Sequence, residues 1–260
     1  MRGSGTASPL KLRVARFVTS DTAGQLIGAL PGSRVRHHGL WFDVRSSDFS
    51  PQVRAQMFWG VYESAETRMI RGLLRGSTAV VELGSSLGVT SAHIASVMAP
   101  GGRLVCVEAN PLLLPGLRER LARRTASLRV DFIHAAVAGH CGGAVLALSP
   151  RTMSSRLGAA LPQDTAVEVP TVTLREILRR TGITDFDLVS DIEGAESAFL
   201  LQDPEVLRKC QRAVIELHDA TFDDRAVLMS ELLDATVAVG LRVIRRHGPV
   251  VGLARDHRRG

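Results

Sequence analysis

The chain has 260 residues, of which 45% are hydrophobic, 22% charged and 4% aromatic. This composition is typical of a folded globular protein. It excludes the disordered, collagen-like and disulfide-dense classes, and no apolar run reaches the ~20 residues of a membrane helix. The net charge is +6, but the basic residues are dispersed arginines, with Lys11 and Lys209 as the two lysines. Without a clustered basic patch, nucleic acid is not the favoured partner.

The three cysteines are odd in number and far apart, and they form no Cys-x-x-Cys or Cys/His metal pattern. Nothing in their spacing requires an oxidising compartment, and the N-terminal residues lack the apolar core and cleavage site of a signal peptide. We therefore expect a cytoplasmic protein. The sequence leaves its oligomeric state open.

Residues 1–75 are predicted to form an N-terminal extension and substrate-covering cap. Residues 1–10 are rich in Gly, Ser and Thr and are expected to be frayed. Ser50-Pro51 has the residue types of a helix N-cap followed by the first helical position. The expected elements are a short hairpin or extended piece over 35–44, a helix from 51 to about 59, and a helix over 63–74.

Residues 76–260 are predicted to form the main domain, in which short apolar runs alternate with helical segments. Such alternation is typical of buried parallel strands in βαβ units. We expect strands at 78–83, 103–108, 128–135, 186–192 and 212–218, and helices at 89–98, 111–124, 174–180, 195–201, 204–210 and 223–239. Strand pieces and a loop are expected over 139–170, and a terminal antiparallel hairpin over 241–246 and 250–255. The predicted fold is α/β, a doubly wound, Rossmann-like and mostly parallel sheet.

Ligands of such sheets bind at the carboxyl ends of the strands, and the first strand runs into the turn Glu82-Leu83-Gly84-Ser85-Ser86-Leu87-Gly88. Glycine at 84 and 88 would allow close approach of a ligand, and the next helix presents its N-terminal N–H groups there. The second strand ends at Glu108, where a carboxylate can accept hydrogen bonds from a ribose diol. The alternative is that the two glycines only make a tight turn.

The identity of the cofactor depends on position 86. A dinucleotide fingerprint needs a glycine there to make room for pyrophosphate, and this chain has Ser86. A nicotinamide oxidoreductase is therefore disfavoured. The pattern suits a nucleoside without pyrophosphate, and S-adenosyl-L-methionine is such a ligand.

Several collinear segments over about residues 55–220 resemble class I S-adenosylmethionine-dependent methyltransferases of the FkbM type. These segments are GVYE (60–63), VVELGSSLGVTS (80–91), VCVEANP (105–111), VPTVTLREIL (169–178), FDLVSDIEGAE (186–196) and AVIELHD (213–219). The resemblance implies methyl transfer to a hydroxyl of a sugar, polyketide or similar metabolite. It also implies a lysine before the aspartate of the fourth strand, where this chain has Ser190. We expect the cofactor to be bound by Glu82, Gly84, Ser86, Gly88, Glu108, Ala109, Asn110, Ala136, Asp191, Tyr62 and Glu63.

The reacting end of the site is expected where the fourth and fifth strands end. Residues two apart on a strand face the same side, which pairs Asp191 with Glu193 and Glu216 with His218. His218 is the first candidate for the general base because its ordinary pKa lies nearest neutrality, and Asp191 is the second. Each has an alternative, since His218 could be an ordinary strand-end residue and Asp191 a helix cap.

Three further alternatives remain open. Asp191, His218 and Asp219 could gather Mg²⁺, although a histidine makes this set less suited to that ion. A nucleic-acid methyltransferase would use the same cofactor, but acidic residues at the fourth strand would repel a phosphate backbone. A non-catalytic S-adenosylmethionine-binding domain could keep the fold without the chemistry. Glu196 is expected to lie on a helix surface.

Overall fold

The structure is a computed structural model that describes residues 20–29, 32–148, 155–157 and 165–255. The segment 1–10 that was expected to be frayed lies outside these residues. The chain divides into two compact units, Met1–Ser64 and Ala65–Gly260. The division falls before the predicted boundary at residue 75, because helix α4 (Ser64–Leu73) packs on the sheet of the second unit. There the Met69 sulfur lies 3.4 Å from the position that a Cβ at Gly252 would occupy.

Between residues 20 and 64, the described part of the first unit contains two helices and a hairpin. Its elements are α2 (Asp21–Ala29), β1 (Arg34–His37), β2 (Leu40–Asp43) and α3 (Pro51–Phe58). Strands β1 and β2 are antiparallel, which confirms the predicted hairpin. The Ser50 hydroxyl accepts a hydrogen bond from the Val53 N–H and Pro51 opens α3, so the predicted helix start is also confirmed.

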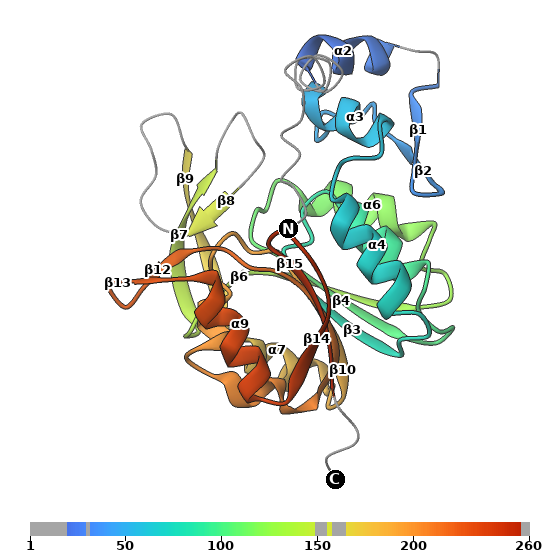
Figure 1. The fold of residues 1–260 in the computed structure, drawn as a ribbon. Coiled ribbons are helices and arrows are strands. Elements are labelled where there is room, and N and C mark those ends of the chain that lie inside the picture. The colour runs from blue at the N-terminus through green and yellow to red at the C-terminus, as the bar shows by residue number, and fades with distance from the viewer. Residues whose placement is uncertain (1–19, 30–31, 149–154, 158–164, 256–260) are drawn as a thin grey trace, which may run out of the picture. The chain divides into compact units, whose positions relative to one another are not determined.

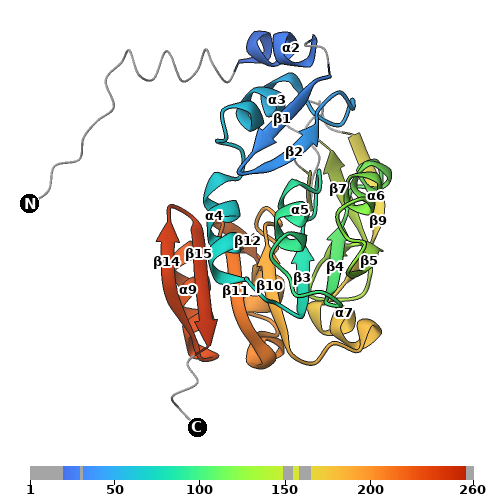
Figure 2. The same ribbon diagram turned by 90° about the vertical axis from the view of Figure 1, so that its right-hand side faces the viewer.

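The second unit is built on a seven-stranded sheet in the order β14-β15-β11-β10-β3-β4-β5. Strands β3, β4, β5, β10 and β11 pair in parallel, whereas β15 is antiparallel to both of its neighbours. The chain moves outward from β3 to β5 and then returns to β10 on the other side of β3 (Figure 2). The strand order therefore reverses between β3 and β10, which is where ligands bind in such folds. The strands are β3 (Ala79–Leu83), β4 (Arg103–Glu108), β5 (Arg129–His134), β10 (Phe186–Ser190), β11 (Cys210–Glu216), β14 (Leu241–His247) and β15 (Val250–Arg255).

Helices cover both faces of this sheet, as Figure 1 shows for α4 and α6 on one side and α7 and α9 on the other. The largest core cluster joins the sheet to α7, α8 and α9 through residues such as Val81, Leu188, Ile177, Phe199 and Leu232. The predicted doubly wound α/β fold is confirmed. The helices are α5 (Val89–Ala95), α6 (Leu114–Ala122), α7 (Leu174–Thr181), α8 (Ser197–Leu200) and α9 (Met229–Ala238), with a 3-10 helix η1 (Pro204–Lys209).

The irregular segment after β5 forms a second, four-stranded sheet in the order β6-β9-β7-β8. Its strands are β6 (Ala136–Val137), β7 (Gly142–Leu148), β8 (Ser155–Leu157) and β9 (Thr165–Val172). The strand pieces expected over 139–170 are therefore found. Two of them, β7 and β9, make a long antiparallel pair.

The predicted helix over 223–239 is wrong in its first turns. A short antiparallel hairpin, β12 (Ala220–Phe222) and β13 (Arg225–Val227), comes before the helix, and α9 begins only at Met229. Asp223 and Asp224 form the turn with φ of 50° and 57°. Aspartate tolerates this left-handed conformation, which explains a turn within a sequence that otherwise has helical periodicity. In the described part of the chain, the helices all fall short of the length and apolarity needed to cross a membrane.

Candidate active site

The turn after β3 adopts an unusual backbone conformation. Gly84, Ser86 and Gly88 have φ of 83°, 44° and 72°. A Cβ at Gly84 would lie 2.0 Å from the Asp191 carbonyl oxygen, and one at Gly88 would lie 2.6 Å from a methyl group of Leu117. Both glycines are therefore required by left-handed backbone and by packing inside the protein. These contacts supply a reason for the glycines other than the close approach of a ligand on which the sequence argument rested.

The buried Glu82 side chain forms hydrogen bonds that hold this turn in place. Its carboxylate is 1% exposed and accepts hydrogen bonds from the hydroxyls of Ser85 (2.9 Å) and Ser91 (2.5 Å). Burial raises the pKa of Glu82 to about 7, against the opposing effect of these hydrogen bonds. The side chain thus ties the turn to the first turn of α5. This contact gives Glu82 a positioning role among the predicted cofactor residues.

Glu108 lies at the carboxyl end of β4, beside the same turn. It is 4% exposed, and its two carboxylate oxygens accept the backbone N–H groups of Ser86 (2.6 Å) and Asn110 (2.7 Å). Burial raises the pKa of Glu108, and these N–H groups oppose the rise. Each carboxylate oxygen can accept more than one hydrogen bond, so both retain capacity for ligand hydroxyls. The two backbone contacts fix the carboxylate in place before any ligand arrives.

The remaining predicted cofactor residues are placed less specifically. The Asn110 side chain accepts the Leu112 N–H at 3.0 Å and so shapes the loop after β4, next to the partly buried Ala109. Ala136 is buried in a small cluster of the second sheet. Tyr62 and Glu63 belong to the first unit, where the Tyr62 carbonyl contacts the His37 ring at 2.8 Å. Their part in binding a cofactor stays a prediction.

The turn and the end of β10 are in direct contact. The Asp191 N–H donates to the Leu83 carbonyl at 3.1 Å, and the Asp191 carbonyl packs against Gly84. Any ligand held by the turn at 84–88 therefore lies beside the residues that follow β10 and β11. Parallel strand pairing produces this neighbourhood, since β10 pairs with both β3 and β11.

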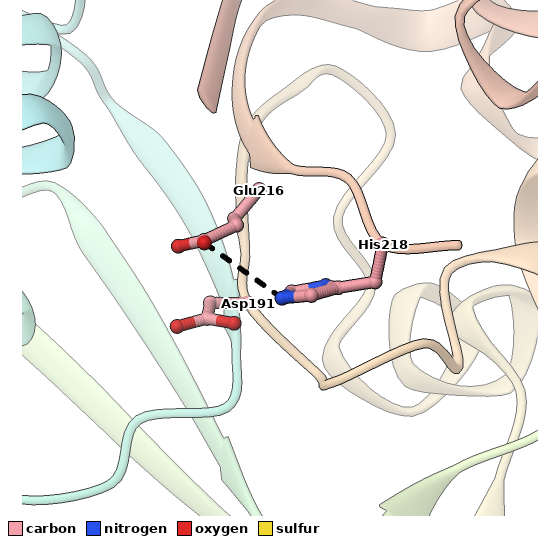
Figure 3. Close-up of side chains that lie close together, drawn as sticks. All are labelled: Asp191, Glu216 and His218. Atoms are coloured by element: carbon pink, nitrogen blue, oxygen red, sulfur yellow. Dashed lines mark ion pairs between the residues drawn. The ribbon is translucent and has the colours of Figure 1, made fainter. Parts of the chain in front are cut away.

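At that edge, Asp191, Glu216 and His218 face one another, as Figure 3 shows. One ligand-type atom from each of the three lies within 4.8 Å of the others. His218 Nε2 is 3.7 Å from Glu216 Oε1 and 3.9 Å from Glu193 Oε2. These distances are longer than hydrogen bonds. Asp191 Oδ1 is buried and accepts no hydrogen bond from the described residues.

Glu196 is a site residue that the sequence argument missed. Its side chain is fully buried rather than on a helix surface, and it accepts the backbone N–H groups of Ile192 (3.1 Å) and Gly194 (3.0 Å). Its Oε1 lies 3.3 Å from His218 Nδ1. The chain can fold back in this way because Glu193 and Gly194 have φ of 53° and 102°. The glycine at 194 was the available signal for such a turn.

The electrostatics of this cluster depend on burial and on charge crowding. Burial, with the nearby Glu193 charge, raises the pKa of Asp191 to about 7. Burial, the Asp191 charge and a hydrogen bond with Glu66 raise the pKa of Glu216 to about 8. The hydrogen bond to Glu196 raises the pKa of His218 to about 9. At neutral pH the imidazole therefore keeps its proton, and Asp191, whose pKa lies nearest neutrality, is better suited than His218 or Glu216 to accept one.

Asp219 and Ser190, two other residues that the sequence analysis discussed, lie outside this cluster of three side chains. The Asp219 carboxylate accepts the Met229 N–H at 2.7 Å at the start of α9, so it caps this helix. The structure groups Glu216, rather than Asp219, with Asp191 and His218. Ser190 ends β10 with 2% exposure, and its hydroxyl has no hydrogen-bond partner among the described residues.

A family described as the Methyltransferase FkbM domain matches residues 82–240, more than half of the chain. The chain belongs to the FkbM methyltransferase family. The resemblance noted from the sequence is confirmed. This family assignment makes the chain an S-adenosylmethionine-dependent methyltransferase and confirms the predicted cofactor. Among curated proteins, none matches this sequence.

Solved structures similar to this chain include several methyltransferases. Fibrillarin from Aeropyrum pernix, bound to S-adenosyl-L-methionine, is 12% identical, with 73% of this chain and 72% of that chain covered and a TM-score of 0.43. An rRNA methylase from Streptococcus thermophilus is 10% identical, with 74% and 95% covered and a TM-score of 0.43. Precorrin-6y C5,15-methyltransferase from Geobacter metallireducens is 15% identical, with 74% and 84% covered and a TM-score of 0.40.

The residues at the ends of β3 and β4 suit the cofactor of this family. A ribose diol needs hydrogen-bond acceptors, and Glu108 offers a carboxylate held by two backbone N–H groups with acceptor capacity left. Ser86 occupies the position at which a dinucleotide fold needs glycine, and its own N–H is engaged by Glu108. The donor and acceptor set therefore fits an adenosyl group without pyrophosphate.

Proposed function

We propose that this FkbM-family protein transfers a methyl group from S-adenosylmethionine to a hydroxyl of a small metabolite or saccharide. The observation that carries the proposal is the contact between Gly84 and Asp191. Through this contact, the turn assigned to the cofactor borders on the cluster of Asp191, Glu216 and His218. Proton-accepting groups thus lie beside the place where a methyl acceptor must be aligned.

The residues divide the work between binding and proton transfer. S-adenosylmethionine supplies a methyl group that is activated by the positively charged sulfur to which it is attached. Glu108 binds the ribose hydroxyls, and Glu82 keeps the turn at 84–88 in shape. Asp191 and Glu216 orient the acceptor hydroxyl, and Asp191 accepts its proton. Glu196 holds the His218 ring in position beside them.

The charge of the acceptor end supports a substrate other than nucleic acid. Asp191, Glu216, Glu193 and Glu66 all contribute carboxyl groups to one neighbourhood, together with the imidazole of His218. Such a concentration of acid repels a phosphate backbone and suits a neutral or cationic acceptor. A sugar or polyketide hydroxyl meets this requirement.

We further propose that the first unit contributes to acceptor binding, with Tyr62 and Glu63 beside the cofactor. Both residues directly precede α4, the helix that also carries Glu66. Cross-linking or hydrogen exchange at 60–63 with and without S-adenosylmethionine tests this assignment. Protection that does not change on cofactor addition would contradict it.

Calorimetry with S-adenosylmethionine and its demethylated product tests the proposed function first. Glu108→Ala should weaken binding by about 10²-fold, because two charge-assisted hydrogen bonds to the ribose contribute roughly 1.5 kcal/mol each. Glu119→Ala, which removes an exposed acid on α6, is the matched control and should bind normally. The absence of binding by either compound at millimolar concentration would refute the proposal.

Transfer of a labelled methyl group to a panel of hydroxylated saccharides and polyketides tests the substrate class. Asp191→Asn and Glu216→Gln should each lower turnover, and Glu216→Gln should leave cofactor affinity within a few-fold, because Glu216 acts on the acceptor alone. Labelling of RNA or DNA, together with salt-dependent binding, would instead support a nucleic-acid methyltransferase. Unchanged turnover in both variants would contradict the roles given to these carboxyl groups.

A further inference from the structure

The cluster at the ends of β10 and β11 has the form of a metal site. Asp191, Glu216 and His218 each direct one donor atom toward a common centre, with all three atoms within 4.8 Å of one another (Figure 3). Ligands around an ion with bonds of about 2.1 Å stand roughly 3 Å apart in cis and 4.2 Å apart in trans. A small contraction of the three side chains would therefore complete one face of a coordination shell.

An unpartnered atom points to a missing ligand at this centre. Asp191 Oδ1 is buried, and no described residue donates a hydrogen bond to it. A carboxylate oxygen in that condition loses its hydration without compensation. His218 Nε2 forms ion pairs with Glu216 at 3.7 Å and with Glu193 at 3.9 Å, both longer than hydrogen bonds. One cation that displaces the Nε2 proton into solvent would contact both the oxygen and the nitrogen.

Glu196 gives His218 the orientation that a metal ligand needs. Its fully buried carboxylate contacts Nδ1 at 3.3 Å, which leaves Nε2 directed at Glu216. A carboxylate behind a histidine fixes the ring tautomer and raises its basicity in many metal sites. Glu196 is itself held by two backbone N–H groups, so this support does not depend on a ligand.

Charge crowding favours a cation at the same point. Glu66 on α4 contacts Glu216, and Glu193 and Glu196 flank His218. Among the described residues, four carboxyl groups thus lie near the imidazole, and Glu66 adds a fifth beside Glu216. A divalent ion bound among them would offset their mutual repulsion at the position where Asp191 and Glu216 meet.

We propose that Asp191, Glu216 and His218 bind a divalent first-row metal ion such as Mn²⁺, with open positions left for the acceptor hydroxyl. Two carboxylates with one imidazole make a mixed donor set, which suits Mn²⁺ better than the all-oxygen set preferred by Mg²⁺. During methyl transfer the ion would orient the acceptor hydroxyl and lower the pKa of that hydroxyl. This role of the ion rests on the proposed function. Binding of the ion does not rest on that function.

Titration of the EDTA-treated full chain with Mn²⁺, followed by electron paramagnetic resonance, tests the site. We expect one bound Mn²⁺ per chain, and pulsed measurements should detect a coupled nitrogen that His218→Gln abolishes. Asp191→Asn and Glu216→Gln should each weaken Mn²⁺ binding by at least about 10-fold, and Glu196→Gln by roughly 10–100-fold. Asp219→Asn keeps the cap of α9 and is the matched control, for which affinity should be unchanged.

Several results would overturn the proposal. The first is that the wild-type chain binds no Mn²⁺ at millimolar concentration. The second is that the nitrogen coupling persists in His218→Gln. The third is that an equal concentration of Mg²⁺ displaces the bound Mn²⁺. If a variant fails to fold by circular dichroism, the nitrogen coupling of the wild-type chain decides alone. Mn²⁺ binding without cofactor binding would refute only the proposed function, and cofactor binding without Mn²⁺ binding would refute only the metal site.

Discussion

Glu82 should make the stability of this protein depend on pH. Its carboxyl group is buried under the turn at 84–88, and its pKa is raised by burial from 4.5 to about 7. The folded state therefore favours the neutral acid. Below pH 4.5 the group is protonated in both the folded and the unfolded chain and has no effect. As the pH rises from 4.5 to 7, the unfolded chain releases this proton while the folded chain keeps it, so stability falls.

The size of the effect follows from the shift. A difference of about 2.5 pKa units, at 1.36 kcal/mol each, lowers the free energy of unfolding by about 3 kcal/mol above pH 7. Glu82→Gln imitates the neutral acid, since an amide oxygen can accept the hydroxyls of Ser85 and Ser91. The Glu82→Gln variant should therefore not lose stability from this group as the pH rises. Its stability relative to the wild type should rise by about 3 kcal/mol between pH 4 and pH 8.

Urea unfolding at several pH values, without added cofactor, measures this difference. Comparison of the two proteins at each pH removes the contributions of other titrating groups, including Asp191 and Glu216. Glu119→Gln on the exposed side of α6 is the control and should change stability by less than about 0.5 kcal/mol throughout. A difference between wild type and Glu82→Gln that stays constant from pH 4 to pH 8 would refute the reasoning.

Three further predictions concern the frame of the site. In urea unfolding, Gly84→Ala should destabilise the protein by several kcal/mol more than Gly101→Ala. Both glycines have positive φ, but an added Cβ would clash with the Asp191 carbonyl oxygen only at Gly84. Equal losses of stability would show that this contact does not affect the free energy of unfolding. Asp187→Ala should lower the free energy of unfolding by about 3–5 kcal/mol, because it leaves the partly buried Arg212 without its ion-pair partner. Asp131→Ala, in the more exposed pair with Arg103, should lower it by less than about 1 kcal/mol. Similar losses for the two variants in urea unfolding would contradict the role of burial. Asp219→Ala should lose about 1 kcal/mol of helix capping in thermal unfolding while Asp219→Asn loses only a few tenths, and a full loss in both would exclude a capping role.

The local pattern of residues was enough to predict most of the fold. Apolar runs such as those of β3, β4 and β10 are short, continuous and bounded by glycine or acid, which is how strands buried on both faces look in a sequence. The helix start at Ser50-Pro51 and the terminal hairpin were also predicted correctly. The turn at Asp223 and Asp224 was missed, because helical periodicity continues through two residues whose left-handed backbone only the folded chain reveals.

The sequence by itself determined the βα order, the turn at 84–88 and the acid at 108, and hence the family and its cofactor. Each of these features depends on residues that lie close together along the chain. Only the tertiary structure decided how the reacting end is built. Pairing of β10 with β3 and β11 brings Asp191, Glu216 and His218 to one point, and the reversed turn at 193–194 carries Glu196 beneath the histidine. The spacing along the strands indicated which strand ends carry the reacting groups, but their distances and the contact of Glu196 with His218 depend on burial and backbone turns that neither spacing nor residue type records.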